Sequence, residues 1–224
     1  MLRPSTGRAD PVPLDTVADV RSGYVPSSLD IKERKRAETS AEAERWERVE
    51  LPGDDHPPLL GLLPKALRDD GTVDWDRLEP VAPMRQAQRY ALRLGDVLLP
   101  LRTQRLQAVR IDRLPPEPLL AVGPWAVMTP HHVDSDYLTW FLNLPRTLAT
   151  LDSRMMGSTL RFLTVGTVRD LEVPVPDLDT QHRIGRLARL TRHVAHLERE
   201  LADARIRLAD AVALQALQQT LRTR

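Results

Sequence analysis

The sequence predicts an α+β protein in which a globular domain is followed by one long helix. Short apolar runs separated by turn residues occupy most of the chain and are typical of strands. One capped segment with helical periodicity interrupts these runs. The last part of the chain carries a heptad pattern without proline. We therefore expect a domain over residues 1–178, with a mixed or antiparallel sheet and short helices, and a projecting coiled-coil helix over residues 179–224.

The composition excludes several classes of protein. The 224 residues contain no cysteine, which removes disulfide scaffolds, thiol nucleophiles, cysteine-type zinc sites and iron–sulfur clusters. No run of about 18 apolar residues is present, and the first residues lack the apolar core of a signal peptide. We expect a cytoplasmic protein with no membrane association.

The charge balance alone does not indicate a nucleic-acid partner. The formal net charge is +1, but 29 of the 32 basic residues are arginine. Arginine presents a rigid fork of donors that suits phosphates and the guanine edge. A GC-rich genome, which favours arginine codons, is the simpler explanation of this bias.

The first half of the chain predicts few regular elements. Residues 11–25 fit a strand or short helix, followed by a loop at Ser22–Gly23. Residues 27–50 are dense in charge and indicate an exposed helix or a mobile loop. Residues 52–83 are rich in turn residues on either side of a short apolar run, 59–67.

The second half predicts most of the sheet. Residues 90–101 fit a strand, a turn at Gly95–Asp96 and a second, buried strand. Two further strands are expected, one in residues 107–113 and one in residues 119–128. Residues 134–151 begin with an Asp/Ser cap and have helical periodicity up to Pro145. A polar loop over 153–162 and a strand over 171–176 complete the domain.

The C-terminal segment has the apolar spacing of a coiled coil. Over about 42 residues, from Thr180 to Leu221, apolar positions alternate at spacings of three and four. Such a helix is roughly 63 Å long, which exceeds the width of the domain, so a partner helix is needed to cover its stripe. Folding back onto its own domain is the alternative. The stripe consists of Leu187, Leu190, Val194, Leu197, Leu201, Ala204, Leu208 and Ala211.

The order of these segments resembles the specificity (S) subunit of type I restriction–modification systems. The most specific piece is VPVPDLDTQHRI, a proline-bearing strand followed by a glutamine at the start of a long helix. LRLGDVLLPLR, the helix beginning DYLTWFLNL and the GST loop occur in the corresponding order. The resemblance covers residues 12–221, but residues 27–50 are more charged than the family pattern, so nothing is carried over there.

The resemblance implies a half-size S subunit. A full S subunit has two target-recognition domains alternating with two long helices, and this chain has one of each. In the family each domain reads one half of a bipartite DNA site, while the antiparallel helices set the spacing and dock methyltransferase subunits. Two copies of this chain would form an antiparallel homodimer that reads a pseudo-palindrome.

A register can be written for that homodimer. If facing residue numbers sum to about 405, its axis crosses near Ala202–Asp203, and large residues face small ones in two of three central layers. Leu201 then meets Ala204 and Val194 meets Ala211, while Leu197 meets Leu208 in the third layer. Opposite charges also meet in a parallel pair, so the antiparallel orientation rests on the resemblance.

The chain carries no catalytic motif. It has no phosphate-binding G-x-x-x-x-G-K-[ST] loop, no Asn/Asp-Pro-Pro-Tyr motif and no nuclease spacing of carboxylates and lysine. We expect a subunit that is not an enzyme and holds no cofactor. The resemblance places S-adenosylmethionine in a DNA adenine methyltransferase partner, and ATP in a restriction subunit if one is bound. No metal site is expected at His131–His132, at His193 and His196 or at Asp54–His56.

The candidate DNA-facing residues lie in three polar loops that match family segments beside DNA. Arginine can bridge phosphates or bind guanine, and serine or threonine can bind a base edge or a phosphate. The candidates are Arg21, Ser22 and Tyr24 in the first loop, Arg102, Thr103 and Arg105 after the buried strand, and Arg154, Ser158, Thr159 and Arg161 around the GST loop.

Two other functions stay open at this point. In the first, the chain is a protein-interaction module that binds partners through the heptad helix and does not bind DNA. The near-zero net charge favours this function. In the second, the chain is a DNA-binding defence accessory that works without a methyltransferase. Salt-dependent DNA binding separates the first from the other readings, and co-purification of a methyltransferase separates the second.

Overall fold

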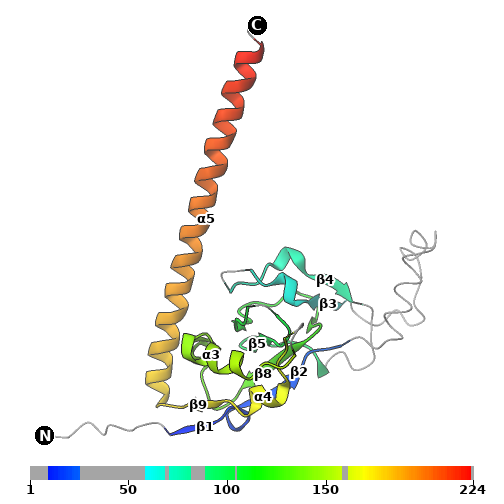
Figure 1. The fold of residues 1–224 in the computed structure, drawn as a ribbon, viewed down its shortest axis with the longest axis vertical. Coiled ribbons are helices and arrows are strands. Elements are labelled where there is room, and N and C mark those ends of the chain that lie inside the picture. The colour runs from blue at the N-terminus through cyan, green and yellow to red at the C-terminus, as the bar shows by residue number, and fades with distance from the viewer. Residues whose placement is uncertain are drawn as a thin grey trace, which may run out of the picture.

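A computed structural model describes residues 10–25, 59–68, 71–81, 89–103, 105–157 and 161–222. It shows a domain of short strands and helices from which one long helix projects (Figure 1). The α+β class and the long C-terminal helix are therefore as the sequence predicts.

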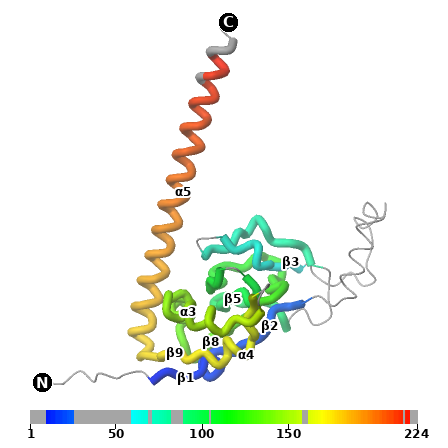
Figure 2. The backbone as a smooth tube through the Cα atoms, in the orientation of Figure 1, coloured from blue at the N-terminus to red at the C-terminus, as the bar shows by residue number. Residues whose placement is uncertain are grey.

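The centre of the domain is a four-stranded antiparallel sheet in the order β2-β8-β5-β6. A three-stranded sheet, β4-β3-β7, pairs β3 with β4 antiparallel and with β7 parallel. A separate pair, β1 and β9, lies at the base of the long helix (Figure 2). The strands are β1 (Pro11–Pro13), β2 (Ala18–Ser22), β3 (Leu59–Leu62), β4 (Glu79–Val81), β5 (Val97–Pro100), β6 (Val109–Arg110), β7 (Leu119–Ala121), β8 (Trp125–Pro130) and β9 (Glu172–Pro174).

The four-stranded sheet is covered on both faces. Successive residues of a strand point to opposite faces, so Val97 and Leu99 join one apolar cluster while Leu98 joins the other. The first cluster is closed by helices and includes Leu138 of α2 (Ser135–Leu142). The second is closed by the three-stranded sheet around Trp125, whose indole nitrogen donates to two backbone carbonyls. This explains why β5 is apolar throughout.

Three sequence predictions of elements need correction. Residues 119–128 form two strands, because the chain turns at Gly123, where φ is +104°. The first strand expected within 90–101 is only an isolated bridge at Ala91, although the Gly95–Asp96 turn and the buried β5 are present. In residues 134–151 the helix predicted up to Pro145 is present as α2, but a second helix, α3 (Pro145–Ser153), follows it, because a proline fits the first turn of a helix but not its interior. Residues 27–50 lie outside the described residues.

The long helix α5 (Leu178–Arg222) begins at a capped turn. The carboxylate of Asp177 accepts hydrogen bonds from the backbone nitrogen of Thr180 at 2.9 Å and from its hydroxyl at 2.7 Å. These hydrogen bonds hold the pKa of Asp177 below its ordinary value. The cap satisfies donors that the first helical turn leaves unpaired, so the helix starts within two residues of the predicted boundary.

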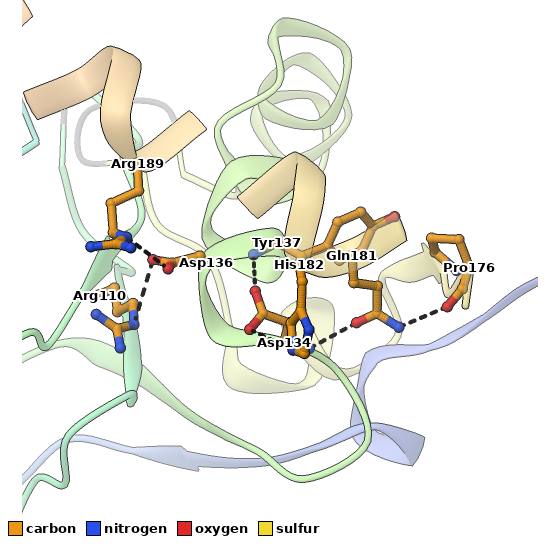
Figure 3. A network of polar contacts seen from close by, with 8 residues as sticks. All are labelled: Arg110, Asp134, Asp136, Tyr137, Pro176, Gln181, His182 and Arg189. Atoms are coloured by element: carbon orange, nitrogen blue, oxygen red, sulfur yellow. Dashed lines mark hydrogen bonds and ion pairs between the residues drawn. The ribbon is translucent and has the colours of Figure 1, made fainter. Parts of the chain in front are cut away.

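The first turns of α5 are fixed against the N-terminus of α2 (Figure 3). The side chain of Gln181 is buried, accepts from the Asp134 backbone nitrogen and donates to the Pro176 carbonyl, both at 2.8 Å. A Cβ atom at Gly185 would lie 2.7 Å from the backbone nitrogen of Tyr137 and 2.8 Å from the Asp134 carboxylate. Only glycine permits this approach, so the direction of α5 relative to the domain is closely defined.

The face of α5 that contacts the domain is opposite the heptad stripe. Gln181, Gly185 and Ala188 are wholly or partly buried, and they recur at helical spacing. At about 100° per residue, the stripe through Leu190, Val194 and the other heptad positions lies roughly 180° around the helix from them. Its large residues are all exposed, from 47% at Leu190 to 67% at Leu187 and Leu208. The alternative in which the helix folds back to cover this stripe is therefore wrong.

Replacing Gln181 should weaken this junction. Gln181→Leu keeps a similar volume but leaves the Asp134 N–H and the Pro176 carbonyl without their partner. We expect the free energy of unfolding to fall by about 2–6 kcal/mol in urea denaturation, because each of the two buried unsatisfied groups costs about 1–3 kcal/mol. The control is Gln218→Leu on the exposed far part of the same helix, expected within about 0.5 kcal/mol of wild type. Equal effects of the two substitutions would contradict the junction.

Candidate nucleic-acid interface

Three predicted loops meet at one edge of the four-stranded sheet. Because β2 and β5 both run antiparallel to β8, their C-terminal ends lie together. Ser22 is paired with Ala126, and Pro100 is paired with Trp125. The backbone nitrogen of Leu163 donates to the Leu101 carbonyl at 2.7 Å, which brings the third loop to the same edge. Segments far apart in the sequence therefore form one surface.

The loop after β5 presents two unengaged arginines. Thr103 accepts a hydrogen bond from the backbone nitrogen of Arg105 and donates to its carbonyl, at 3.1 Å and 3.0 Å. This small turn holds the backbone while the side chains of Arg102 and Arg105 are exposed. Within the described part of the chain, neither guanidinium forms a hydrogen bond or an ion pair. Both remain available to an anionic ligand.

The third loop is partly described. Arg154 ends α3 and is exposed, and it lines a shallow pocket of about 410 Å³. Arg161 is also exposed, but its guanidinium binds Asp152 through the carboxylate at 2.9 Å and the backbone carbonyl at 2.6 Å. Ser158 and Thr159 lie outside the described residues. Arg154 therefore differs from Arg161: within the described part of the chain, its guanidinium forms no hydrogen bond or ion pair.

Arg21 serves a different role from the other candidates. Its guanidinium donates to the carbonyls of Tyr90 and Ala91 at 3.4 Å and 3.0 Å and lies 3.9 Å from Asp96. Burial lowers the pKa of Arg21, and the Asp96 carboxylate acts in the opposite direction. These contacts tie Arg21 to the sheet. Its role at a DNA surface stays a prediction.

Asp96 is a structural residue that sequence reasoning placed only in a turn. Its side chain is 1% exposed, and it accepts from the backbone nitrogen of Arg93 at 2.9 Å and from the Thr129 hydroxyl at 2.8 Å. Gly95 precedes it with φ of +89°. A buried carboxylate without such donors would be costly. The Gly-Asp pair in front of an apolar strand is the sequence signal for it.

The remaining candidates of the first loop differ in exposure. Ser22 ends β2 and is exposed. Tyr24 is half-buried, and its ring lies 5.5 Å from that of Tyr90 in a tilted arrangement. Its backbone nitrogen donates to the Ala121 carbonyl at 2.7 Å. Tyr24 therefore helps to hold the loop at the sheet edge.

The far half of α5 has apolar residues on two faces. Besides the heptad stripe, Ile206 and Leu217 are exposed by 60% and 55%. At about 100° per residue they lie roughly opposite the stripe, whereas Leu214 lies about 60° from Ala211 and flanks it. One partner helix on the stripe would leave Ile206 and Leu217 uncovered, which indicates a second interaction surface.

Two observations on the described part of the chain concern metal-ligating side chains and membrane-spanning helices. No group of three or more metal-ligating side chains occurs there. His131 and His132 contact one another edge-to-face, and His131 lies 3.9 Å from Asp19. No helix among the described residues has the length and apolar character needed to cross a membrane.

The fold is that of type I restriction–modification (R-M) S subunits. One similar chain, from a structure that addresses complex assembly and conformational transition of the type I R-M system, has 21% identity and a TM-score of 0.53. It matches 91% of this chain and 43% of its own length. The HsdS subunit from Thermoanaerobacter tengcongensis has 20% identity and a TM-score of 0.50, with 89% of this chain and 40% of that chain covered. This chain thus spans about two-fifths of each. No family model and no curated protein matches it.

Replacing single arginines with alanine should distinguish those whose contacts stabilise the fold from those whose guanidinium groups form no contact with it. Arg21→Ala loses two hydrogen bonds to carbonyls beside a buried carboxylate, so the free energy of unfolding should fall by about 1–3 kcal/mol. Arg102→Ala should change it by less than about 0.5 kcal/mol. Urea denaturation of both variants measures this. A stable Arg21→Ala variant would show that the contacts of Arg21 do not support the fold.

Proposed function

We propose that this chain is a DNA sequence-recognition subunit of a type I-like R-M complex. In this role it reads one half of a bipartite site and acts as an antiparallel homodimer. One observation carries the proposal: in a fold shared with S subunits, α5 binds the domain with one face and exposes a complete heptad stripe on the opposite face. The catalytic chemistry, with S-adenosylmethionine and ATP, belongs to other subunits in this proposal.

The length of α5 suits a two-fold pair. Its 45 residues extend well past the domain, since every described residue from Leu197 onward is exposed. In the register in which facing numbers sum to about 405, the projecting half of each helix covers the stripe beside the other copy's domain. The two domains then lie at opposite ends of the pair in inverted orientations. Such a dimer reads inverted half-sites.

The sheet edge with three loops is the proposed DNA surface. Arg102, Arg105 and Arg154 have exposed guanidinium groups, and Ser22 adds an exposed hydroxyl. Contacts to phosphates position a protein on the duplex, and contacts to base edges provide sequence specificity. A net charge of +1 is compatible with this role because phosphate contacts depend on where free arginines lie and not on the total charge.

The apolar residues opposite the stripe are the proposed docking surface for the modification subunits. Ile206 and Leu217 stay exposed when a second copy covers the stripe. An exposed apolar face beside a closed helix pair favours a further helix of another protein. We propose that a DNA adenine methyltransferase subunit binds there, and that a restriction subunit, where present, binds through it.

DNA binding should depend on the free arginines. The double variant Arg102→Ala/Arg105→Ala should bind duplex DNA more weakly. Its slope of log K against log salt concentration should be smaller by about 2, because each lost phosphate contact removes roughly 0.9. The control Arg93→Ala/Arg113→Ala removes the same charge at the opposite edge of the sheet and should leave the slope unchanged. Fluorescence anisotropy at several salt concentrations gives both slopes, and equal slopes would remove the loop from the interface.

Self-association should depend on the stripe. Leu201→Arg places a charge at the centre of the proposed helix pair. The Kd of the dimer should rise by at least about 100-fold, because burying an unpaired charge costs roughly 3 kcal/mol. Ile206→Arg, on the opposite face, should leave the dimer intact. Sedimentation equilibrium of the two variants makes the comparison. A wild-type chain that stays monomeric at micromolar concentration would contradict the homodimer.

A further inference from the structure

A cleft separates α5 from the domain just above the point where the two are joined. Its volume is about 490 Å³, and α5 forms one wall with Arg192 and His196. The opposite wall comes from the domain and includes Trp75, Val109 and Asp136. A cleft of this size is within the range of small-ligand sites. The proposed DNA loops lie elsewhere, at the C-terminal end of β5, whereas β6 pairs with its N-terminal end.

The cleft gathers more positive than negative charge. Arg110 and Arg189 approach the Asp136 carboxylate from different elements, at 3.6 Å and 3.1 Å (Figure 3). Arg192 and Asp112 also line the cleft. The lining contains three arginines and two carboxylates. Its formal charge is therefore +1 when the histidines are counted as neutral. The excess lies in a recess, where solvent screens charge less than it does at an open surface.

Two of the arginines have unused donors. The Nε atom of Arg110 is buried and faces the Asp136 carboxylate at 3.6 Å, while its two Nη atoms form no hydrogen bond within the described part of the chain. Arg192 is half-buried and forms no hydrogen bond or ion pair within the described part of the chain. Burial lowers the pKa of Arg192, and the Asp136 carboxylate raises it. Guanidinium donors without an acceptor in a recess are available to an anionic ligand.

The histidines on the helix wall complete the set of titratable groups. His193 is exposed, while the imidazole of His196 lies 3.4 Å from the Glu200 carboxylate, further along the helix. The Thr139 hydroxyl is already donated to the Ser135 carbonyl. The guanidinium groups are therefore the main donors that remain for a ligand.

We propose that this cleft is an anion site that binds a phosphate group through Arg110 and Arg192, with Arg189 held beside it by Asp136. The planar guanidinium fork matches phosphate oxygens in geometry and charge. The apolar walls at Val73, Trp75 and Val109 accommodate the body that carries the phosphate. Two sources supply this chemistry: the backbone of a duplex that runs along α5, and a free nucleotide. If the duplex is the source, the site deepens the proposed function by adding a sequence-independent contact.

Titration calorimetry with inorganic phosphate tests the site, with ionic strength held constant by sodium chloride. Wild type should bind phosphate. Arg192→Gln should weaken binding by at least about tenfold, the effect of losing one charged hydrogen bond. Arg189→Gln is a second variant that removes a cleft charge from a half-exposed position. Arg186→Gln, an exposed arginine of the same helix outside the cleft, is the control and should bind within about twofold of wild type.

Competition then identifies the source. Displacement of phosphate by a 20-base-pair duplex assigns the site to the DNA backbone, and displacement by adenosine monophosphate alone assigns it to a free nucleotide. The proposal is overturned if wild type does not bind phosphate, if acetate binds equally well, or if Arg186→Gln loses as much affinity as Arg192→Gln. Duplex binding that persists in those cases leaves the proposed DNA recognition intact, because the loop arginines act independently of this cleft.

Discussion

The close contact between the first turns of α5 and the N-terminus of α2 determines where the other parts of the chain can act. Gly185 allows the two helices to approach at backbone distance, and Gln181 links the α2 terminus to the end of β9 through two hydrogen bonds. Both contacts involve backbone atoms, which have little freedom to adjust. The domain is therefore held on α5 in one orientation, and the helix can set the distance between two such domains.

This constraint also explains why the helix needs a partner. One face of α5 is used for the domain, so the domain cannot cover the heptad stripe on the other side. Isolated helices gain most of their stability from packing, and the half beyond Leu197 has none within the described chain. A second copy provides a stripe of the same length and spacing. Symmetry then places the two DNA-facing edges in inverted orientations without any further interaction.

The sequence predicted the elements whose signals are local and missed those that depend on tertiary contacts. The heptad spacing and the Asp177 cap determine α5 within the segment itself, and the apolar run Val97–Leu99 identified the buried strand. The split at Gly123 was missed although Gly123–Pro124 is a local turn signal. The pairing of the strands across the sheet left no such signal. Among the candidate site residues, Arg102 and Arg105 are as exposed as expected. The engagement of Arg21 depends on a carboxylate 75 residues away in the chain and could not be read from the loop.

The most direct test is selection of bound sequences from a library of random DNA duplexes, with the wild-type chain and its modification partner. Two domains held at fixed angles on one helix pair should enrich two inverted copies of a short sequence, separated by a spacer of constant length and variable composition. Enrichment of a single half-site, or of paired half-sites with variable spacing, would contradict a rigid two-fold dimer as the unit that reads DNA.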